Sequence, residues 1–400
     1  MKIAFSPPDI NDNDIQAVVD VLKSGWITTG PKTKEFETEL SAYCGTARTA
    51  CMNSATAALE LTLRVLGIGS GDEVITSAYT YSASASVICH VGAKPVLVDT
   101  AADSFEMDPQ CLSAAINGKT KAIIPVDIAG IPCDYDTIHQ IVDEKCPIFT
   151  PSTPLQSAVG RVAVIADAAH SLGAVYKGRA SGGITDFTCF SFHAVKNLTT
   201  GEGGSVTWRD FSKADPAISD DDLYRQFMLY SLHGQDKDAL AKSRLGAWEY
   251  DIVGPFYKCN MTNIAAALGS SQLKRYDKML ARRLEIVETY NNALASLPIS
   301  LPVHVDETRK SSGHLYMIRL DGHGEAERNA FIAKMAEHGV ACNVHYKPLP
   351  MLSAYKNIGF DIADFQNAYN QYSNVVSLPL HTCLTDNQVK YVTDTVKLCV

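Results

Sequence analysis

A lysine and an aspartate lie in neighbouring stretches of this chain, and their residue types suit a shared chemistry. Lys196 lies in SFHAVKNLTTGEGG (residues 191–204), among small and hydroxyl residues, and Asp167 ends the apolar run VAVIAD. A lysine amine forms a Schiff base with an aldehyde, and a carboxylate holds a pyridinium nitrogen protonated so that the ring accepts electrons. Pyridoxal 5'-phosphate (PLP) requires both groups. The pair therefore predicts a PLP site in which Lys196 is the catalytic residue.

Each of these residues also has an ordinary explanation. A lone lysine among polar neighbours is usually solvated, and an aspartate at a strand end is often a helix cap. A third segment, NSAT (residues 53–56), supports the PLP hypothesis because it follows a strand-like run and opens a helix with periodic apolar residues. Backbone amides at a helix N-terminus bind phosphate, so Ala55 and Thr56 are candidate phosphate contacts. Simple capping by Ser54 is the alternative.

An aromatic pair follows another strand-like run. Tyr79 and Tyr81 come directly after EVITS (residues 73–77). An aromatic ring at this position would stack on the face of a pyridine ring, and core packing is the alternative for either tyrosine.

Six short β-rich runs carry these motifs at their ends: EVITS, KPVLVD, KAIIPV, VAVIAD, DFTCFSF and GSVTW. The segments between them are long enough for crossover helices, which predicts a mainly parallel sheet covered by helices on both faces. Active groups of such a sheet gather at strand ends. We therefore expect the lysine, aspartate and tyrosine motifs to meet at one edge.

The length of 400 residues predicts two domains, because single cores stop growing beyond roughly 250–300 residues. We expect a large domain over residues 12–265 and a small C-terminal domain over residues 266–400, which residues 1–11 and a helix at 11–22 join. A nearly continuous helical pattern at 263–297 would bridge the two domains.

Two segments carry further expectations. On the bridging helix, Arg282 and Arg283 should lie on the solvated face. The proline-rich stretch 146–161 should be a surface insertion of unreadable function.

The composition excludes several classes of protein. The net charge is −9, which disfavours nonspecific nucleic-acid binding and adsorption to anionic membranes. No apolar stretch is long enough to cross a membrane and no export signal is visible, so we expect a cytoplasmic protein. The 11 cysteines include no CxxC pair, and His338 and His345 lack companion ligands at metal-binding spacing. We predict reduced thiols and no metal site.

The order of the motifs resembles the DegT/DnrJ/EryC1/StrS family of sugar aminotransferases. The resemblance runs from about Pro7 to the C-terminus and rests on SGWITTGP, NSATAAL, GDEVIT, GAKPVLVD, TKAIIPV, ADAAH, SFHAVKNLTTGEGG and SLPLHTCLT. It implies an α/β fold of PLP fold type I, with a large mainly parallel seven-stranded sheet domain and a smaller C-terminal α+β domain. It also implies a homodimer with shared active sites, which moves an amino group from L-glutamate to a nucleotide-linked keto sugar.

The resemblance assigns roles to individual residues. Lys196 corresponds to the Schiff-base lysine, Asp167 to the partner of the pyridinium nitrogen, and Tyr81 to the stacking aromatic. The implied cofactor contacts are Ala55, Thr56, Tyr81, Asp167, His170, Ser191, His193 and Lys258, and the implied substrate contacts are Trp26, Thr28, Thr29 and His345. Lys258 is a departure from the family pattern, because many members have an asparagine there that reaches the cofactor phosphate of the neighbouring subunit. A lysine would serve that phosphate as a point charge.

Retention of Lys196 favours transamination over dehydration, since the dehydrating members resembling this chain replace the lysine by histidine. No arginine follows Arg328, which disfavours a specialist for amino-acid carboxylates. The SFHAVKN form of the lysine motif resembles members that act at C4 of UDP-linked 4-keto-6-deoxy-N-acetylhexosamines for surface polysaccharides. A 3-keto sugar, a dTDP or GDP sugar, or a keto-cyclitol is the alternative substrate.

Two other classes of function are alternatives to a sugar aminotransferase. A noncatalytic protein that binds PLP or a sugar nucleotide would use the same fold, although the retained lysine and aspartate disfavour it. A nicotinamide dehydrogenase is poorly supported, because no GxGxxG motif follows the first predicted strand and the glycines of GIGSGDE follow a helix instead.

Overall fold

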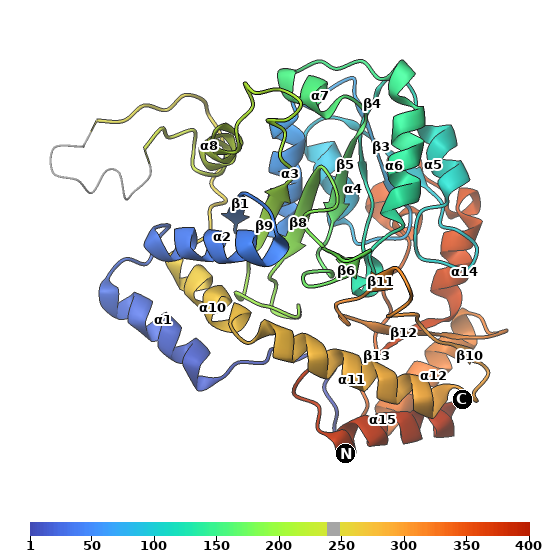
Figure 1. Cartoon of the computed structure of the whole chain (residues 1–400). Coiled ribbons are helices and arrows are strands. Elements are labelled where there is room, and N and C mark those ends of the chain that lie inside the picture. Colours follow the sequence, from blue (N-terminus) through green and yellow to red (C-terminus); the bar gives the residue numbers. More distant parts are fainter. Residues whose placement is uncertain (238–248) are drawn as a thin grey trace.

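The computed structural model describes residues 1–237 and 249–400, and its centre is one seven-stranded sheet (Figure 1). The strand order is β1-β9-β8-β5-β4-β2-β3. The bounds are β1 (Thr49–Met52), β2 (Glu73–Ser77), β3 (Lys94–Val98), β4 (Thr120–Ile124), β5 (Ala163–Asp167), β8 (Phe187–Ser191) and β9 (Gly204–Trp208). The strands from β8 to β3 are parallel, whereas β9 pairs antiparallel with β8 and with β1. All six β-rich runs of the sequence are therefore strands.

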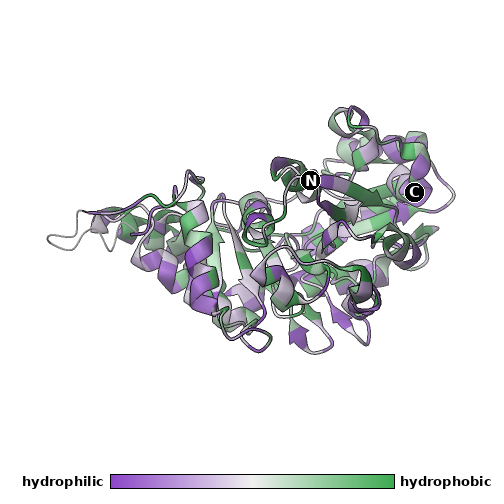
Figure 2. Cartoon of the chain, turned by 90° about the horizontal axis from the view of Figure 1, so that it is seen from above, coloured by the Kyte–Doolittle hydropathy of each residue, from purple (hydrophilic) through white to green (hydrophobic). Residues whose placement is uncertain are grey.

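Helices cover both faces of this sheet, as the alternating pattern predicts (Figure 1). One apolar cluster packs the sheet against α2 (Pro31–Cys44), α5 (Pro109–Ala115) and α6 (Tyr135–Glu144). The other packs it against α3 (Ala55–Val65), α4 (Ala83–His90), α7 (Pro154–Val159) and α8 (Asp220–Ser231). Successive strand residues such as Val74 and Ile75 enter opposite clusters, because side chains alternate across a sheet. Figure 2 shows the result, with apolar strands between helices whose outward turns are hydrophilic.

A second region follows in the sequence and has its own apolar cluster. Its antiparallel sheet has the order β10-β12-β13, with β10 (Ile299–Ser300), β12 (Tyr316–Leu320) and β13 (Val375–Leu378). The helices of this cluster are α11 (Tyr276–Leu294), α12 (Glu325–Glu337) and α15 (Asp386–Cys399), and Ile3 of the N-terminal segment packs among them. Two further helices, α13 (Ser353–Lys356) and α14 (Gln366–Asn374), share another apolar cluster with Tyr79 and Leu97 of the first region. The expected division at residue 265 stays a prediction.

Short elements connect the two regions. β11 (Arg309–Lys310) pairs with β6 (Val175–Tyr176), which pairs with β7 (Arg179–Ala180). Apart from these connections, the described residues form 3-10 turns within the two regions: η1 (Ile128–Gly130), η2 (Cys146–Ile148), η3 (Leu349–Met351) and η4 (Ile362–Asp364).

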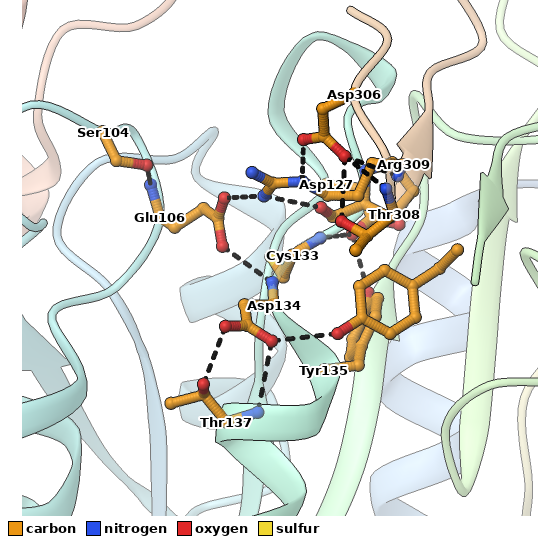
Figure 3. A network of polar contacts seen from close by, with 12 residues as sticks. Ser104, Glu106, Asp127, Cys133, Asp134, Tyr135, Thr137, Asp306, Thr308 and Arg309 are labelled. Atoms are coloured by element: carbon orange, nitrogen blue, oxygen red, sulfur yellow. Dashed lines mark hydrogen bonds and ion pairs between the residues drawn. The ribbon is translucent and has the colours of Figure 1, made fainter. Parts of the chain in front are cut away.

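Figure 3 shows the polar contacts at this junction. The Arg309 guanidinium lies between the carboxylates of Glu106, at 2.5 Å, and Asp306, at 3.0 Å. Glu106 also accepts a hydrogen bond from the backbone of Asp134. An ion-pair network thus fastens the second region to the first.

The bridging helical pattern is two helices, α10 (Asn263–Leu273) and α11, separated at residues 274–275. The predicted exposure of Arg283 is wrong. Its side chain is buried and donates hydrogen bonds to the carbonyls of Gly313, His314 and Leu380. These carbonyls would otherwise lack a donor in the interior, and the guanidinium supplies one. Arg282 does reach the surface, where it pairs with Asp386.

Two further expectations need correction. The stretch 146–161 contains η2 and the helix α7, which begins at a proline in its first turn. Leu155 and Val159 of α7 enter the core beside the sheet, so this stretch is not simply a surface loop. The N-terminal helix α1 (Asp12–Ser24) lies against α10 rather than within the second region. Among the described residues, no helix has the length and apolar character needed to span a membrane.

Candidate active site

A cavity of about 460 Å³ opens where β5 and β8 end and α3 begins, and it brings the predicted motifs together. Most of the predicted cofactor and catalytic residues line it: Ala55, Thr56, Tyr81, Asp167, His170, Ser191, His193 and Lys196. These residues come from segments up to 141 positions apart in the sequence, between Ala55 and Lys196, so their convergence is a property of the fold. Of the residues predicted to contact the cofactor, only Lys258 lies elsewhere.

Asp167 is the last residue of β5 and is 5% exposed. One carboxylate oxygen accepts a hydrogen bond from the Ser84 hydroxyl at 2.7 Å, and the other accepts one from the Ala169 amide at 3.2 Å. Burial raises the pKa of Asp167, while these hydrogen bonds and the nearby Lys196 oppose that rise. A cationic nitrogen in the cavity would stabilise the buried carboxylate further.

Lys196 lies in the loop between β8 and β9, in a tight turn closed by its amide and the carbonyl of His193 at 2.9 Å. Burial lowers the pKa of Lys196 to about 8, and the charge of Asp167 opposes that shift. At pH 7 a lysine with this pKa has about a tenth of its amine in the neutral form, far more than an unperturbed lysine has. The amine is therefore available as a nucleophile and as a base.

The start of α3 forms the opposite wall. Ser54 caps the helix by accepting a hydrogen bond from the Ala57 amide at 3.1 Å, so the expected capping by Ser54 is confirmed. Capping uses one amide only, and other first-turn amides have no partner within the helix. A Cβ atom at Gly204 would lie 2.3 Å from the Ala55 nitrogen, so only glycine lets β9 approach the helix start. Ser191 completes this end of the cavity, which has the donors that a phosphate needs.

His170 is buried beside these groups, and burial lowers its pKa well below the usual value. Its Nε2 atom lies 3.1 Å from the hydroxyl of Tyr346, and its Nδ1 atom has no hydrogen-bond partner among the described residues. Tyr346 lines the cavity and lies 5.9 Å from the ring of Tyr81 between centroids. The sequence reasoning missed Tyr346, although it directly follows His345 in the segment that resembles substrate-binding stretches.

Behind the cavity, Asp127 supports the loop that follows β5. Its buried carboxylate accepts hydrogen bonds from the hydroxyls of Tyr135, at 2.7 Å, and Ser171, at 2.6 Å (Figure 3 for Tyr135). Ser171 directly follows His170, and burial raises the pKa of Asp127 to about 6. No local pattern around Asp127 predicts this support.

The four predicted substrate contacts do not line the cavity of the single chain. The ring of His345 contacts Ser377 at 2.8 Å and stacks on Phe5. Trp26, Thr28 and Thr29 form a turn that holds the start of α10, with Asn263 donating to the Thr28 carbonyl at 3.1 Å.

Lys258 is exposed and contacts Asn260. Its predicted role at the cofactor phosphate of a neighbouring subunit, and the substrate contacts named above, stay predictions. Among the described residues, no group of histidines, cysteines or carboxylates could hold a metal ion.

Comparison with protein families matches residues 8–397 to the DegT/DnrJ/EryC1/StrS aminotransferase family. The chain belongs to this family. The aminotransferase is 38% identical over 399 residues to the spore coat polysaccharide biosynthesis protein SpsC of Bacillus subtilis, covering 99% of this chain and 96% of SpsC.

Solved structures extend this likeness. The PLP form of the putative sugar aminotransferase Spr1654 from Streptococcus pneumoniae has a TM-score of 0.95 and 54% identity, covering 100% of this chain and 98% of that one. PseC of Helicobacter pylori, an aminotransferase involved in the biosynthesis of pseudoaminic acid, has a TM-score of 0.84 and 27% identity, covering 100% and 99% of the two chains. The protein is therefore a PLP-dependent sugar aminotransferase.

The cavity fits PLP by its own chemistry. It joins a lysine of lowered pKa, a buried carboxylate, a helix N-terminus approached through Gly204, and a buried imidazole nitrogen without a partner. An aldehyde, a pyridine nitrogen, a phosphate and a ring hydroxyl are the groups that such a set would hold.

Proposed function

We propose that this aminotransferase takes an amino group from L-glutamate and transfers it to C4 of a UDP-linked 4-keto-6-deoxy-N-acetylhexosamine, for surface polysaccharide synthesis. The SFHAVKN form of its lysine motif supports this substrate. The likeness to SpsC and PseC supports the pathway class, because their names refer to a coat polysaccharide and to pseudoaminic acid. A 3-keto sugar, a dTDP or GDP sugar, or a keto-cyclitol is the runner-up.

The observation that carries the proposed catalytic roles is the meeting of Lys196 and Asp167 in one cavity beside the start of α3. Bound PLP supplies a ring that withdraws electrons from the carbon bearing the transferred amine. Asp167 keeps the ring nitrogen protonated, since its buried carboxylate gains from a cationic partner. Ala55, Thr56 and Ser191 hold the phosphate, and Tyr81 and His170 contact the ring.

Lys196 has two proposed tasks. Its neutral amine attaches the cofactor, and after substrate has displaced it, the Nζ atom takes a proton from the substrate carbon and returns it at the cofactor side. A pKa of about 8 suits both directions of this transfer, because the best acid–base catalysts titrate near the working pH. His193 is half-exposed, and its Nε2 atom lies 3.6 Å from a carboxylate oxygen of Glu202. Its proposed role is to face the substrate.

The test separates the two half-reactions. PLP-loaded enzyme mixed with L-glutamate should lose its lysine-bound absorption band and release 2-oxoglutarate. The amino form should then produce an amine from one member of a panel of nucleotide keto sugars, and we expect the UDP-linked 4-keto sugar to react fastest. Reaction with glutamate but preference for a 3-keto or dTDP sugar would overturn the substrate, and no amine from any of them would overturn the function.

We also propose a homodimer with shared active sites. The arm around residues 250–257 exposes Tyr250, Ile252 and Val253 by 50%, 45% and 53%, and leads to Lys258. Lys258 is the one predicted cofactor contact that lies outside the cavity of its own chain. Exposed apolar side chains beside it form a surface that a second copy of the chain would cover.

Mixed dimers test this sharing directly. A Lys196→Ala subunit combined with a Lys258→Ala subunit should contain one fully wild-type site if Lys258 acts across the interface. That one site should then bind PLP with the affinity of the parent. The weaker affinity of the Lys258→Ala homodimer at that site would show that Lys258 acts within its own chain.

A further inference from the structure

A buried segment of the second region, residues 311–314, lies between the two loops that carry the proposed catalytic residues. Its sequence is SSGH, and Ser311, Ser312 and His314 are 1%, 0% and 4% exposed. The segment directly precedes β12. Neither His314 nor Ser312 lines the cavity, so neither is placed to touch a substrate.

The segment holds the loop of Asp167 and His170 on one side. The Ser312 hydroxyl donates to the carbonyl of His170, and the Ser312 amide donates to the carbonyl of Gly130 at 3.0 Å. The ring of His314 packs on the ring of His170 with centroids 4.5 Å apart. A Cβ atom at Gly130 would lie 2.1 Å from the Ser312 hydroxyl, so the approach depends on that glycine.

The same segment holds the lysine loop on its other side, through Asn197. The side-chain Nδ2 atom of Asn197 donates to the Ser312 carbonyl at 2.8 Å, and the side-chain oxygen of Asn197 lies 2.9 Å from Nδ1 of His314. Because the amide group faces a carbonyl, the Asn197 oxygen is the acceptor and His314 Nδ1 donates. Burial lowers the pKa of His314 well below its usual value, which keeps this imidazole neutral. Asn197 is itself buried and directly follows Lys196.

We propose that His314 is a positioning residue of the active site, which fixes the backbone of Lys196 through Asn197 and the ring of His170 by direct packing. The inference rests on the proposed roles of Lys196 and His170. During turnover the Lys196 side chain must leave the cofactor and return to the same place. A backbone held by two buried hydrogen bonds ensures that return, since a displacement of about 1 Å costs on the order of 100-fold in rate.

Three variants test the proposal. His314→Leu removes the donor and keeps the apolar bulk, while His314→Asn retains an amide donor near the position of Nδ1. The matched control is His139→Leu. His139 is a partly buried histidine that contacts the Ile184 carbonyl at 3.3 Å and Arg161 at 3.2 Å. Both contacts lie outside residues 311–314 and outside the two loops that this segment holds.

We expect His314→Leu to lower kcat of the glutamate half-reaction by about 10- to 100-fold with KM changed less than about threefold. The pH midpoint of the lysine-bound cofactor band should shift as well. His314→Asn should recover most of both, and His139→Leu should lose thermal stability but keep the kcat and spectrum of the parent. If His314→Leu and His139→Leu behave alike, the positioning role is wrong. A wild-type enzyme without a lysine-bound band would instead contradict the proposed function.

Asn197→Ala provides a second measurement that does not depend on the folding of His314→Leu. If His314 acts through Asn197, Asn197→Ala should shift the same spectral midpoint, and the double variant should be no worse than the poorer single variant. Additive losses in kcat would show that the two residues act independently and would overturn the link.

Discussion

The inner side of the proposed active site, around Asp167 and His170, is formed within one chain. The outer side, around Tyr81 and Lys258, is not closed by the same chain. On the inner side, Asp167 and His170 are 5% and 7% exposed. The side chains that support them, Ser84, Asp127 and His314, are buried and hydrogen bonded. On the outer side, Tyr81 is 64% exposed, and Lys258 lies outside the cavity. The inner side is therefore preorganised by the fold alone. The outer side has the exposed ring of Tyr81, which the proposed homodimer would cover.

The largest effect should come from the inner side. Lys196→Arg keeps the positive charge but cannot serve as a nucleophile or base near neutral pH, because the guanidinium stays protonated. Amine formation should fall by at least about 100- to 10,000-fold. Lys94→Arg, at an exposed lysine of the same sheet, is the control and should match the parent. Parent-like turnover by Lys196→Arg would contradict the assignment.

Asp167→Asn should be the next most damaging change. The amide has the size of the carboxylate but no charge, so the ring nitrogen would lose the partner that keeps it protonated. We expect kcat to fall by about 100-fold or more while PLP remains bound. The half-reaction with glutamate measures this directly. A variant with normal kcat would show that Asp167 has only a structural role.

Gly204→Ala should disturb the phosphate end of the cavity. Its Cβ atom would lie 2.3 Å from the Ala55 nitrogen, and backbone cannot give way as a flexible side chain does. We expect a loss of about 1–3 kcal/mol in the free energy of unfolding, together with weaker PLP binding. Gly183→Ala is the control, because the nearest atom there lies at 3.5 Å. Equal PLP affinity in the two variants would contradict the role of this end.

The pH dependence of cofactor capture follows from Lys196. Its pKa is lowered to about 8, so below that pH most of the amine is protonated and unreactive. The rate at which PLP-free enzyme attaches PLP should rise with pH up to about 8 and then level off. Stopped-flow absorption from pH 6 to pH 10 measures this profile. A rate that still climbs at pH 10 would mean an unperturbed lysine.

The smallest effect should come from the outer side. Lys258→Ala removes a point charge at an exposed position, and such contacts contribute little, so PLP affinity should weaken by only about two- to fivefold. Lys258→Asn, which supplies the residue common in the family, should stay close to the parent. A loss as large as that of Asp167→Asn would place Lys258 among the essential groups and erase the contrast between the two sides.

The sequence predicted that the motifs of the inner side meet, because each motif ends or follows a strand whose apolar run is readable locally. Asp167 ends β5 and Ser191 ends β8 in the structure as expected. Tyr346 and His314 were not predictable in this way. They come from the second region, and only the tertiary fold brings them to His170.

The errors have a common physical origin. Arg283 and the stretch 146–161 were assigned to the surface because arginine, proline and polar residues usually lie there. In the structure the Nη1 atom of Arg283 donates to three backbone carbonyls, and a proline begins α7. Local composition cannot show when the interior offers such partners.

The most direct test of the central claim is reduction of the PLP-loaded enzyme with borohydride, followed by peptide mass mapping. This treatment makes the bond between lysine and cofactor permanent. The account predicts one modified lysine, Lys196, and no modification after prior incubation with excess L-glutamate. Label on another lysine, or none in the wild-type protein, would contradict it.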